Sequence, residues 1–133
     1  MNLDFASVWE MVADLVPDND ALICGEDIVS WKDYDLRSSK IAAALSSMGL
    51  GPNSKAGLYL NNSNEYLIGQ NAIFKIGGVP INVNYRYVEE ELIYLLDNSD
   101  AEAVFYHACY SSRIHKIAKS LPNVKAWIEV PDG

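Results

Sequence analysis

The residues of this sequence that are best placed to do chemistry follow two of its short apolar runs. Asn61 opens an Asn-Asn-Ser-Asn turn after one run, and His107 directly follows another. If both runs are parallel strands, these residues lie where ligands collect in open α/β sheets, just beyond the carboxyl ends. The turn lacks the glycines that let a backbone approach a phosphate closely, so a helix cap supplied by Ser63 or Asn62 is the simpler interpretation. His107 has no evident partner, and such a histidine is more often structural than catalytic.

Other polar residues have equally simple interpretations. Gln70 and Asn71 interrupt a helical segment that is otherwise apolar nearly all round, so they are expected to be buried amides with hydrogen-bond partners inside the protein. The acidic run 89–91 could suggest paired carboxylates or a metal site. Consecutive helical residues point in different directions, however, which favours a solvated first turn. One later helix has a basic face that is expected to be solvated, although it could meet an anionic cofactor tail; its residues are Arg113, His115, Lys116 and Lys119.

The sequence contains none of the short motifs that bind phosphates or activate a serine. No Gly-x-x-x-x-Gly-Lys-Ser/Thr loop, no Gly-x-Gly-x-x-Gly turn and no Gly-x-Ser-x-Gly elbow is present. The two cysteines, Cys24 and Cys109, are isolated, so they predict neither a disulfide framework nor a zinc site. Buried, reduced thiols are expected instead. From these residues we expect no catalytic, cofactor-binding or metal-binding residue within the chain.

Charge and hydropathy exclude some partners. The 133 residues include 10 basic and 18 acidic side chains, a net charge of −8. Nucleic-acid phosphates need clustered lysine and arginine, so no nucleic-acid partner is expected, and anionic lipid is disfavoured for the same reason. The first residues lack the basic start and long apolar run of a signal peptide, and no apolar stretch approaches membrane-spanning length. These features predict a cytoplasmic protein that is not an integral membrane protein.

The beginning of the chain predicts a helix followed by a hairpin. Apolar residues recur at helical spacing over 5–16, with Asp4 as a plausible cap. Two short apolar runs, 21–24 and 28–31, flank a Gly-Glu-Asp turn. Their length and spacing predict a small antiparallel hairpin.

A long helix is expected to connect this hairpin to the rest of the chain. Lys32 or Asp33 opens it, and it ends at Met48 before a glycine stop. The chain is predicted to be one unit over residues 1–133, in which 1–31 form the first helix and the hairpin and 32–133 form an alternating α/β unit.

From residue 55 onward, strands and helices alternate. Strands are expected at 55–60, 79–84, 101–106 and 124–130, and helices at 63–76, 89–97 and 111–121. Alternation at this spacing predicts βαβ units, a parallel sheet and helices on both of its faces. Pro80 lacks the N–H that an interior strand needs, which places the second strand at an edge. The predicted fold class is therefore α/β, doubly wound and mostly parallel, with the flavodoxin-like strand order second-first-third-fourth.

The run 74–87, FKIGGVPINVNYRY, closely resembles the second core motif of the adenylate-forming superfamily. That superfamily comprises the acyl-CoA synthetases, the luciferases and the adenylation domains of peptide synthetases. The Asn-Tyr-Arg-Tyr ending and the segment 91–97 look most like bacterial fatty-acyl and steroid-side-chain CoA ligases. Asn61 and Glu65 stand where these enzymes often carry an Asn-x-x-x-Glu turn. The first core motif is looser, because Ser-Trp-Lys-Asp-Tyr at 30–34 replaces the usual Thr-Tyr-x-Glu-Leu.

The resemblance covers nearly the whole chain and implies the N-terminal portion of the large AMP-binding domain of an acyl-CoA synthetase. In this superfamily a carboxylate attacks ATP to give an acyl-adenylate, and coenzyme A then displaces AMP to form a thioester. The full-length enzyme would use ATP, magnesium and coenzyme A, and would activate a medium/long-chain or steroid-side-chain carboxylic acid.

The superfamily's catalytic parts have no counterpart in this sequence. These parts are a Ser/Thr-Gly-rich loop ending in Pro-Lys, a magnesium-linked Glu, a ribose-binding Asp and a C-terminal Lys. No catalytic residue is therefore carried over, and this chain alone is expected to be inactive.

Two alternatives remain open. A stand-alone binding or regulatory module could use the same framework without the chemistry, and it would leave no apolar face uncovered. An unrelated flavodoxin-like or receiver domain would need a phosphate-binding Ser/Thr-rich loop or an Asp cluster at its strand ends, where Asn61, Asn84 and His107 stand instead. A truncated ligase, by contrast, should expose an apolar face and could self-associate through it.

Overall fold

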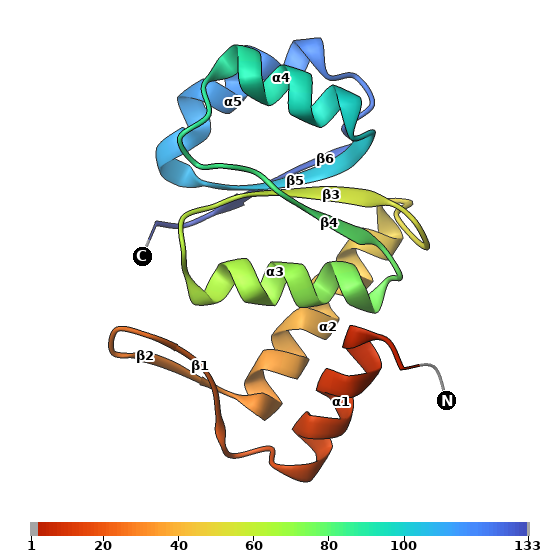
Figure 1. Cartoon of the computed structure of the whole chain (residues 1–133), viewed down its shortest axis with the longest axis vertical. Coiled ribbons are helices and arrows are strands. Elements are labelled where there is room, and N and C mark those ends of the chain that lie inside the picture. Colours follow the sequence, from red (N-terminus) through yellow and green to blue (C-terminus); the bar gives the residue numbers. More distant parts are fainter. Residues whose placement is uncertain (1–2, 133) are drawn as a thin grey trace.

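A parallel sheet separates two groups of helices in the computed structural model, which describes residues 3–132 (Figure 1). Helices α4 (Glu89–Asn98) and α5 (Ser111–Ile117) cover one face of the sheet. Helix α3 (Asn64–Lys75) covers the other face. A further layer lies beyond α3 and is built from α1, α2 and a β-hairpin. The predicted α/β class, with helices on both faces of the sheet, is confirmed.

The N-terminal layer follows the predicted order of elements. Helix α1 spans Phe5–Leu15, the hairpin pairs β1 (Asp20–Cys24) with β2 (Asp27–Ser30), and α2 spans Trp31–Ser47. The two hairpin strands are antiparallel, as the sequence predicts.

The sheet has the predicted strand order. It contains β3 (Lys55–Tyr59), β4 (Val79–Asn82), β5 (Ala101–His107) and β6 (Ala126–Val130), arranged β4-β3-β5-β6 with every pair parallel. Pro80 lies in the edge strand β4, paired with Ala56 of β3. Its missing N–H therefore interrupts no interior ladder.

Side-chain caps explain where three helices begin. The Asp4 carboxylate accepts a hydrogen bond from the Ser7 N–H at 2.8 Å, and the Ser63 hydroxyl accepts one from the Tyr66 N–H at 3.3 Å, so both predicted caps are confirmed. Helix α2 starts earlier than predicted because Ser30, at the end of β2, is its cap; its hydroxyl accepts the Asp33 N–H at 3.2 Å.

The predicted ends of β4 and α5 and the predicted start of β6 are wrong by two or more residues. Strand β4 stops at Asn82 instead of residue 84, because the Asn84 side chain accepts the Arg86 N–H and forms a turn. Helix α5 ends at Ile117, and 118–120 continue as a tighter 3₁₀ turn. Strand β6 begins at Ala126 rather than residue 124, because the Val124 N–H closes a turn onto the Leu121 carbonyl.

The two sheet faces bury separate apolar cores because side chains alternate along each strand. On β3, Ala56 and Leu58 face the core under α2 and α3, whereas Tyr59 faces the core under α4 and α5. Gly57 also faces α4, where an added Cβ would lie 3.1 Å from the Leu96 side chain. This close contact lets α4 pack directly against the sheet.

Helix α3 is covered on both sides and has buried polar contacts on the side facing the N-terminal layer. The Tyr34 hydroxyl donates to the Leu67 carbonyl at 3.2 Å, and the Ser38 hydroxyl donates to the Ile68 carbonyl at 3.3 Å. Burial raises the pKa of Tyr34 to about 12, so its hydroxyl keeps the donated proton at neutral pH. These bonds fix α2 on α3.

Lys75 joins three helices at the end of α3. Its side chain is only 8% exposed, and its ammonium group donates to the Asp35 carboxylate at 2.7 Å and to the Glu10 carboxylate at 2.8 Å. Burial alone would lower the pKa of Lys75. The hydrogen bonds and charges of the two carboxylates outweigh it, so the pKa is raised and the group stays charged.

Both cysteines are exposed, so the prediction of buried thiols is wrong. Cys24 ends β1 next to the hairpin turn, and Cys109 lies in the short 3₁₀ turn that follows β5. Neither position faces a core, since both follow a strand's last inward-facing residue.

Asn71 also differs from expectation. It is 1% exposed, yet neither its amide nitrogen nor its carbonyl oxygen has a hydrogen-bond partner among the described residues. The predicted burial is confirmed and the predicted partners are not found. Asn64, one helical repeat away on α3, is matched in burial at 3% exposed and does donate to the carbonyl and carboxylate oxygens of Asp27.

Replacing these two asparagines by leucine should have opposite effects. Asn71→Leu removes an unpaired buried amide and should raise the free energy of unfolding by about 1–3 kcal/mol. Asn64→Leu removes paired donors and should lower it by about 1–3 kcal/mol. Urea titrations followed by circular dichroism measure both. An Asn71→Leu protein less stable than the wild type would contradict this account of Asn71.

Candidate functional site

The candidate site lies where β3 and β5 end side by side. Helix α3 leaves the end of β3 toward one face of the sheet, and α5 leaves the end of β5 toward the other (Figure 1). This divergence is the switch point at which open α/β sheets place their ligands. The two residues singled out from the sequence, Asn61 and His107, both lie there.

Asn61 and His107 contact each other directly. The Asn61 backbone N–H donates to His107 Nδ1 at 2.9 Å, and the His107 side chain is buried on the α3 side of the sheet. An Nδ1 that accepts a hydrogen bond carries no proton, so the neutral imidazole holds its proton on Nε2. The histidine therefore has the partner that the sequence did not reveal, and it fixes Asn61 in the loop between β3 and α3.

Tyr110 binds the side chain of Asn61. Its hydroxyl donates to Asn61 Oδ1 at 2.6 Å, and its ring stacks on Tyr59 with centroids 4.6 Å apart. Burial, followed by the charges of neighbouring groups, raises the pKa of Tyr110, which keeps the hydroxyl protonated as a donor. The backbone of Asn61 is thus bonded to the last residue of β5, and its side chain is bonded to the turn that follows β5.

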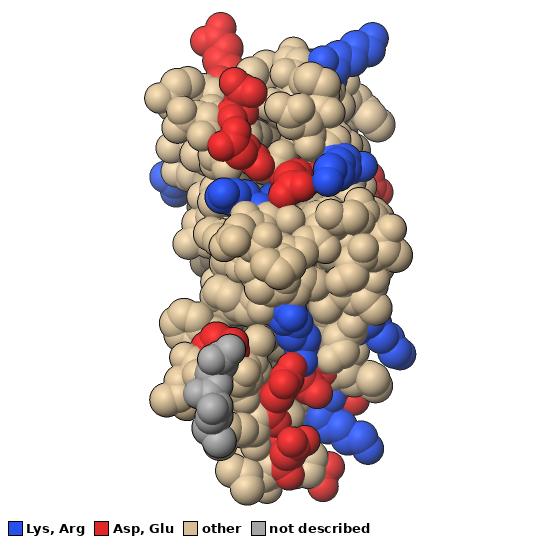
Figure 2. All heavy atoms as spheres, turned by 90° about the vertical axis from the view of Figure 1, so that its right-hand side faces the viewer, with Lys and Arg blue, Asp and Glu red and all other residues tan. Residues whose placement is uncertain are grey.

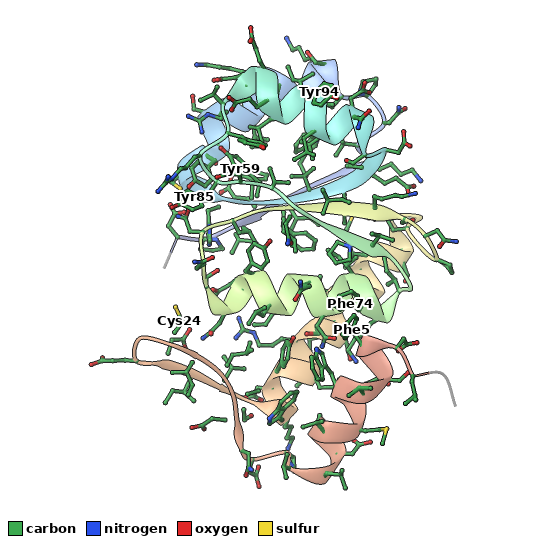
Figure 3. The ribbon with its side chains drawn as sticks, in the orientation of Figure 1. Phe5, Cys24, Tyr59, Phe74, Tyr85 and Tyr94 are labelled. Carbon is green, nitrogen blue, oxygen red and sulfur yellow. The ribbon has the colours of Figure 1, made fainter. Side chains whose placement is uncertain are left out.

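Arg113 extends the same network toward the loop before α4. Its guanidinium donates to the Tyr59 hydroxyl at 2.7 Å and to the Tyr87 carbonyl at 3.1 Å, and the Tyr59 hydroxyl donates to that carbonyl at 2.9 Å (Figure 3). The hydrogen bond to Tyr59 raises the already high pKa of Arg113, so the group is permanently charged. The prediction that Arg113 belongs to a solvated face is wrong, because its side chain turns toward Tyr59.

The rest of that helix and the acidic run behave as expected. His115, Lys116 and Lys119 are exposed. Glu90 and Glu91 are also exposed, and the Glu91 carboxylate accepts the Val88 N–H at 2.9 Å, so the run caps α4. Glu89 lies 4.0 Å from both Arg113 and Lys116, a distance that gives a weak surface attraction.

This network positions loops and performs no evident chemistry. Its members bond to one another, and none of the hydroxyl groups named in it donates a hydrogen bond to a base that could activate it. Across residues 3–132, no group of three or more His, Cys, Asp or Glu side chains comes together as a metal site would need. The expectation that the chain supplies no catalytic, cofactor-binding or metal-binding residue stays a prediction.

Sequence reasoning missed Tyr59, Tyr87 and Tyr110 as members of the site. Tyr59 belongs to an apolar run, which predicts a core residue. Tyr110 follows β5, and no sequence pattern around it indicates a role. Their contacts join residues far apart in sequence, and local spacing carries no signal for such contacts. Within the part of the chain that the structure describes, no helix is both long and apolar enough to cross a membrane.

Comparison with known proteins identifies the family. The family model described as AMP-binding enzyme matches residues 9–132. The chain therefore belongs to the AMP-binding enzyme family, and the expectation drawn from the motif at 74–87 is confirmed.

The curated relatives include ligases that act on long acids. A Medium/long-chain-fatty-acid--CoA/3-oxocholest-4-en-26-oate--CoA ligase from Mycobacterium marinum is 40% identical over 98% of this chain. A 3-oxocholest-4-en-26-oate--CoA ligase from Rhodococcus rhodochrous is 38% identical over the whole chain. This chain covers 24% of the length of each relative.

A solved structure supports the fold. The N-terminal domain of FACL13 from Mycobacterium tuberculosis superimposes with a TM-score of 0.89 at 20% identity, covering 98% of this chain and 34% of that one. At this identity the likeness speaks for the fold alone. It agrees with the match to the N-terminal part of the relatives.

Replacing His107 tests its positioning role. His107→Leu removes the acceptor of the part-buried Asn61 N–H and should lower the free energy of unfolding by about 1–3 kcal/mol. The matched control His115→Leu changes an exposed histidine and should stay within about 0.5 kcal/mol of the wild type. Thermal and urea unfolding measure both variants. Equal effects of the two substitutions would show that the Asn61 contact does not stabilise the fold.

Proposed function

We propose that this chain is the N-terminal portion of an ATP-dependent acyl-CoA ligase. The observation that carries the proposal is the 40% identity to a fatty-acid and steroid-acid CoA ligase over 98% of the chain. The proposed substrate of the whole protein is a medium/long-chain or steroid-side-chain carboxylic acid, since relatives named for such acids match over nearly all of these residues.

The proposed reaction proceeds in two steps. The substrate carboxylate attacks the α-phosphorus of ATP, pyrophosphate leaves, and a mixed anhydride with AMP forms. The coenzyme A thiolate then attacks the acyl carbonyl carbon, AMP leaves, and a thioester forms. ATP, magnesium and coenzyme A are the proposed cofactors of the whole protein.

The residues of this chain have framework roles in that proposal. In the motif 74–87, Gly77 ends α3 at a φ of +76° and Gly78 brings the chain straight into β4. A Cβ on Gly78 would lie 2.8 Å from the Ser54 carbonyl oxygen, which no side chain tolerates. The tight α3–β4 connection then lets the 84–87 segment reach Tyr59 and Arg113 at the candidate site. We assign no catalytic step to any of these residues.

The cellular setting belongs to the same proposal. A cytoplasmic location suits an enzyme that uses ATP and coenzyme A, and the net charge of −8 disfavours a nucleic-acid partner. We also propose that residues 1–31 and 32–133 are the two parts from which this portion is built.

An activity assay tests the proposed function. The purified 133-residue chain, given ATP, magnesium, coenzyme A and palmitate or a steroid-side-chain acid, should form no acyl-CoA thioester. The whole protein encoded by the same gene should form one, with release of AMP. Thioester formation by this chain alone would overturn the framework assignment. A whole protein that binds but never activates an acid would favour a binding or regulatory module.

The isolated chain is further proposed to self-associate through an exposed apolar face. The best candidate is the α4 surface, where Tyr94 is 72% exposed and, with Tyr87 and Leu95, lines a groove of about 470 Å³ (Figure 3). The acidic residues Glu90 and Glu91 of α4 also line this groove.

Sedimentation tests this self-association. The wild-type chain should show a concentration-dependent rise in mass, which Tyr94→Ser should weaken at least about tenfold. Leu36→Ser, an exposed apolar residue on α2, is the matched control and should leave the mass unchanged. A wild-type chain that stays monomeric at high concentration would contradict the proposal.

A further inference from the structure

Nearly all of the net charge of this protein lies in its first 31 residues. That segment contains seven acidic residues and no lysine or arginine, whereas the remaining residues are almost balanced. In the structure this segment forms α1 and the hairpin at one end of the molecule. Figure 2 shows acidic side chains on the lower half of one face, with uncharged surface and some Lys or Arg side chains beside them.

Helix α1 presents an apolar face to solvent within this acidic segment. It packs on the protein through the small residues Ala6 and Ala13, which are buried. Phe5, Val8, Val12 and Leu15 recur at intervals of three and four residues and therefore share a different face of the helix. Leu15 is 77% exposed, and Met11 extends the same surface. We name Leu3, Phe5, Val8, Met11, Val12 and Leu15 the α1 stripe.

A groove continues the α1 stripe onto the end of α3. Leu3, Phe5 and Val8 form one side of a hollow of about 550 Å³, and Phe74 with Gly77 lies on the other. The rings of Phe5 and Phe74 lie 5.1 Å apart (Figure 3). The apolar surface is thus broader than one helix face and is partly concave.

Exposed carboxylates lie beside the α1 stripe. Glu10 is neutralised by the Lys75 ammonium, which leaves Asp4, Asp14 and Asp18 exposed to solvent. The hydrogen bond from the Ser7 backbone lowers the pKa of Asp4 and keeps it ionised. An apolar stripe with three exposed carboxylates beside it favours a partner whose apolar face is flanked by positive charges.

We propose that the α1 stripe and its groove are a docking surface for a partner protein that presents an amphipathic helix flanked by lysine and arginine. The partner's apolar residues would cover the α1 stripe, and its cations would pair with Asp4, Asp14 and Asp18. A second copy of this chain is disfavoured on this face because it would bring the exposed carboxylates of Asp4, Asp14 and Asp18 close to the same carboxylates of the other copy. Anionic lipid and nucleic acid are disfavoured by the same charge.

Designed peptides of roughly 18 residues, about five helical turns, test the surface. The first has a leucine stripe flanked by lysine, the second has the same stripe flanked by glutamate, and the third has the composition of the first in an order without a stripe. Each is titrated into the isotope-labelled 133-residue chain and followed by NMR. The first peptide should shift the amide signals of α1 and of Phe74 and Gly77, and should bind at least about tenfold more tightly than either of the others.

Variants of the chain locate the binding. Met11→Gln with Leu15→Gln should weaken binding of the first peptide at least about tenfold, and Asp14→Asn with Asp18→Asn should weaken it and reduce its dependence on salt. Ile28→Gln, an exposed apolar residue on the hairpin, is the matched control and should bind as the wild type does.

Three outcomes would overturn the proposal. The first is equal binding of the lysine and glutamate peptides. The second is equal binding of the lysine peptide with and without a stripe, which would reduce the effect to net charge. The third is a set of α1 signals that shift with protein concentration alone and stop shifting in Leu15→Gln, which would make a second copy the occupant. None of these results bears on the proposed ligase function.

Discussion

The structure depends on the burial of α3 between the sheet and the N-terminal layer. A helix covered on both sides is expected to be apolar nearly all round and to pair its buried polar groups, and α3 follows this pattern except at Asn71. Ala72 and Ile73 join the core under the sheet, while Asn64 and Lys75 bond to the hairpin and to α1 and α2. Because α3 contacts every part of the N-terminal half, its two ends set the geometry of both the α3–β4 connection and the candidate site.

The same constraint explains why the most recognisable part of the sequence is not a catalytic motif. The run 74–87 contains the end of α3, a turn at two glycines and the edge strand β4. Its last residue, Tyr87, contacts Tyr59 and Arg113 at the switch point. At that point His107, Tyr110 and Asn61 are bonded to one another and hold the loop that begins α3. The chain thus supplies loops that are hydrogen-bonded to one another at the place where α/β proteins bind ligands. This suits the framework of an AMP-binding enzyme better than a site complete in itself.

Local signals predicted most of the fold. Alternating apolar runs, glycine stops and the position of Pro80 gave the strand order, and Asp4 and Ser63 gave two helix starts. The failures at the candidate site share a physical cause, since each depends on a contact that joins distant segments. The partner of His107 is 46 residues away, and Arg113 bonds to Tyr59, which is 54 residues away. The exposure of Cys24 and Cys109 reflects turn geometry that composition does not encode.

The central claim is that these residues are the framework of a longer ligase whose chemistry is encoded downstream. The most direct test is to sequence the gene beyond the codon for Gly133. The account predicts a reading frame that continues and soon encodes a Ser/Thr-Gly-rich loop ending in Pro-Lys, the part of the family that binds ATP. A stop codon immediately after Gly133 would contradict it, and would make a stand-alone binding module the better description of this protein.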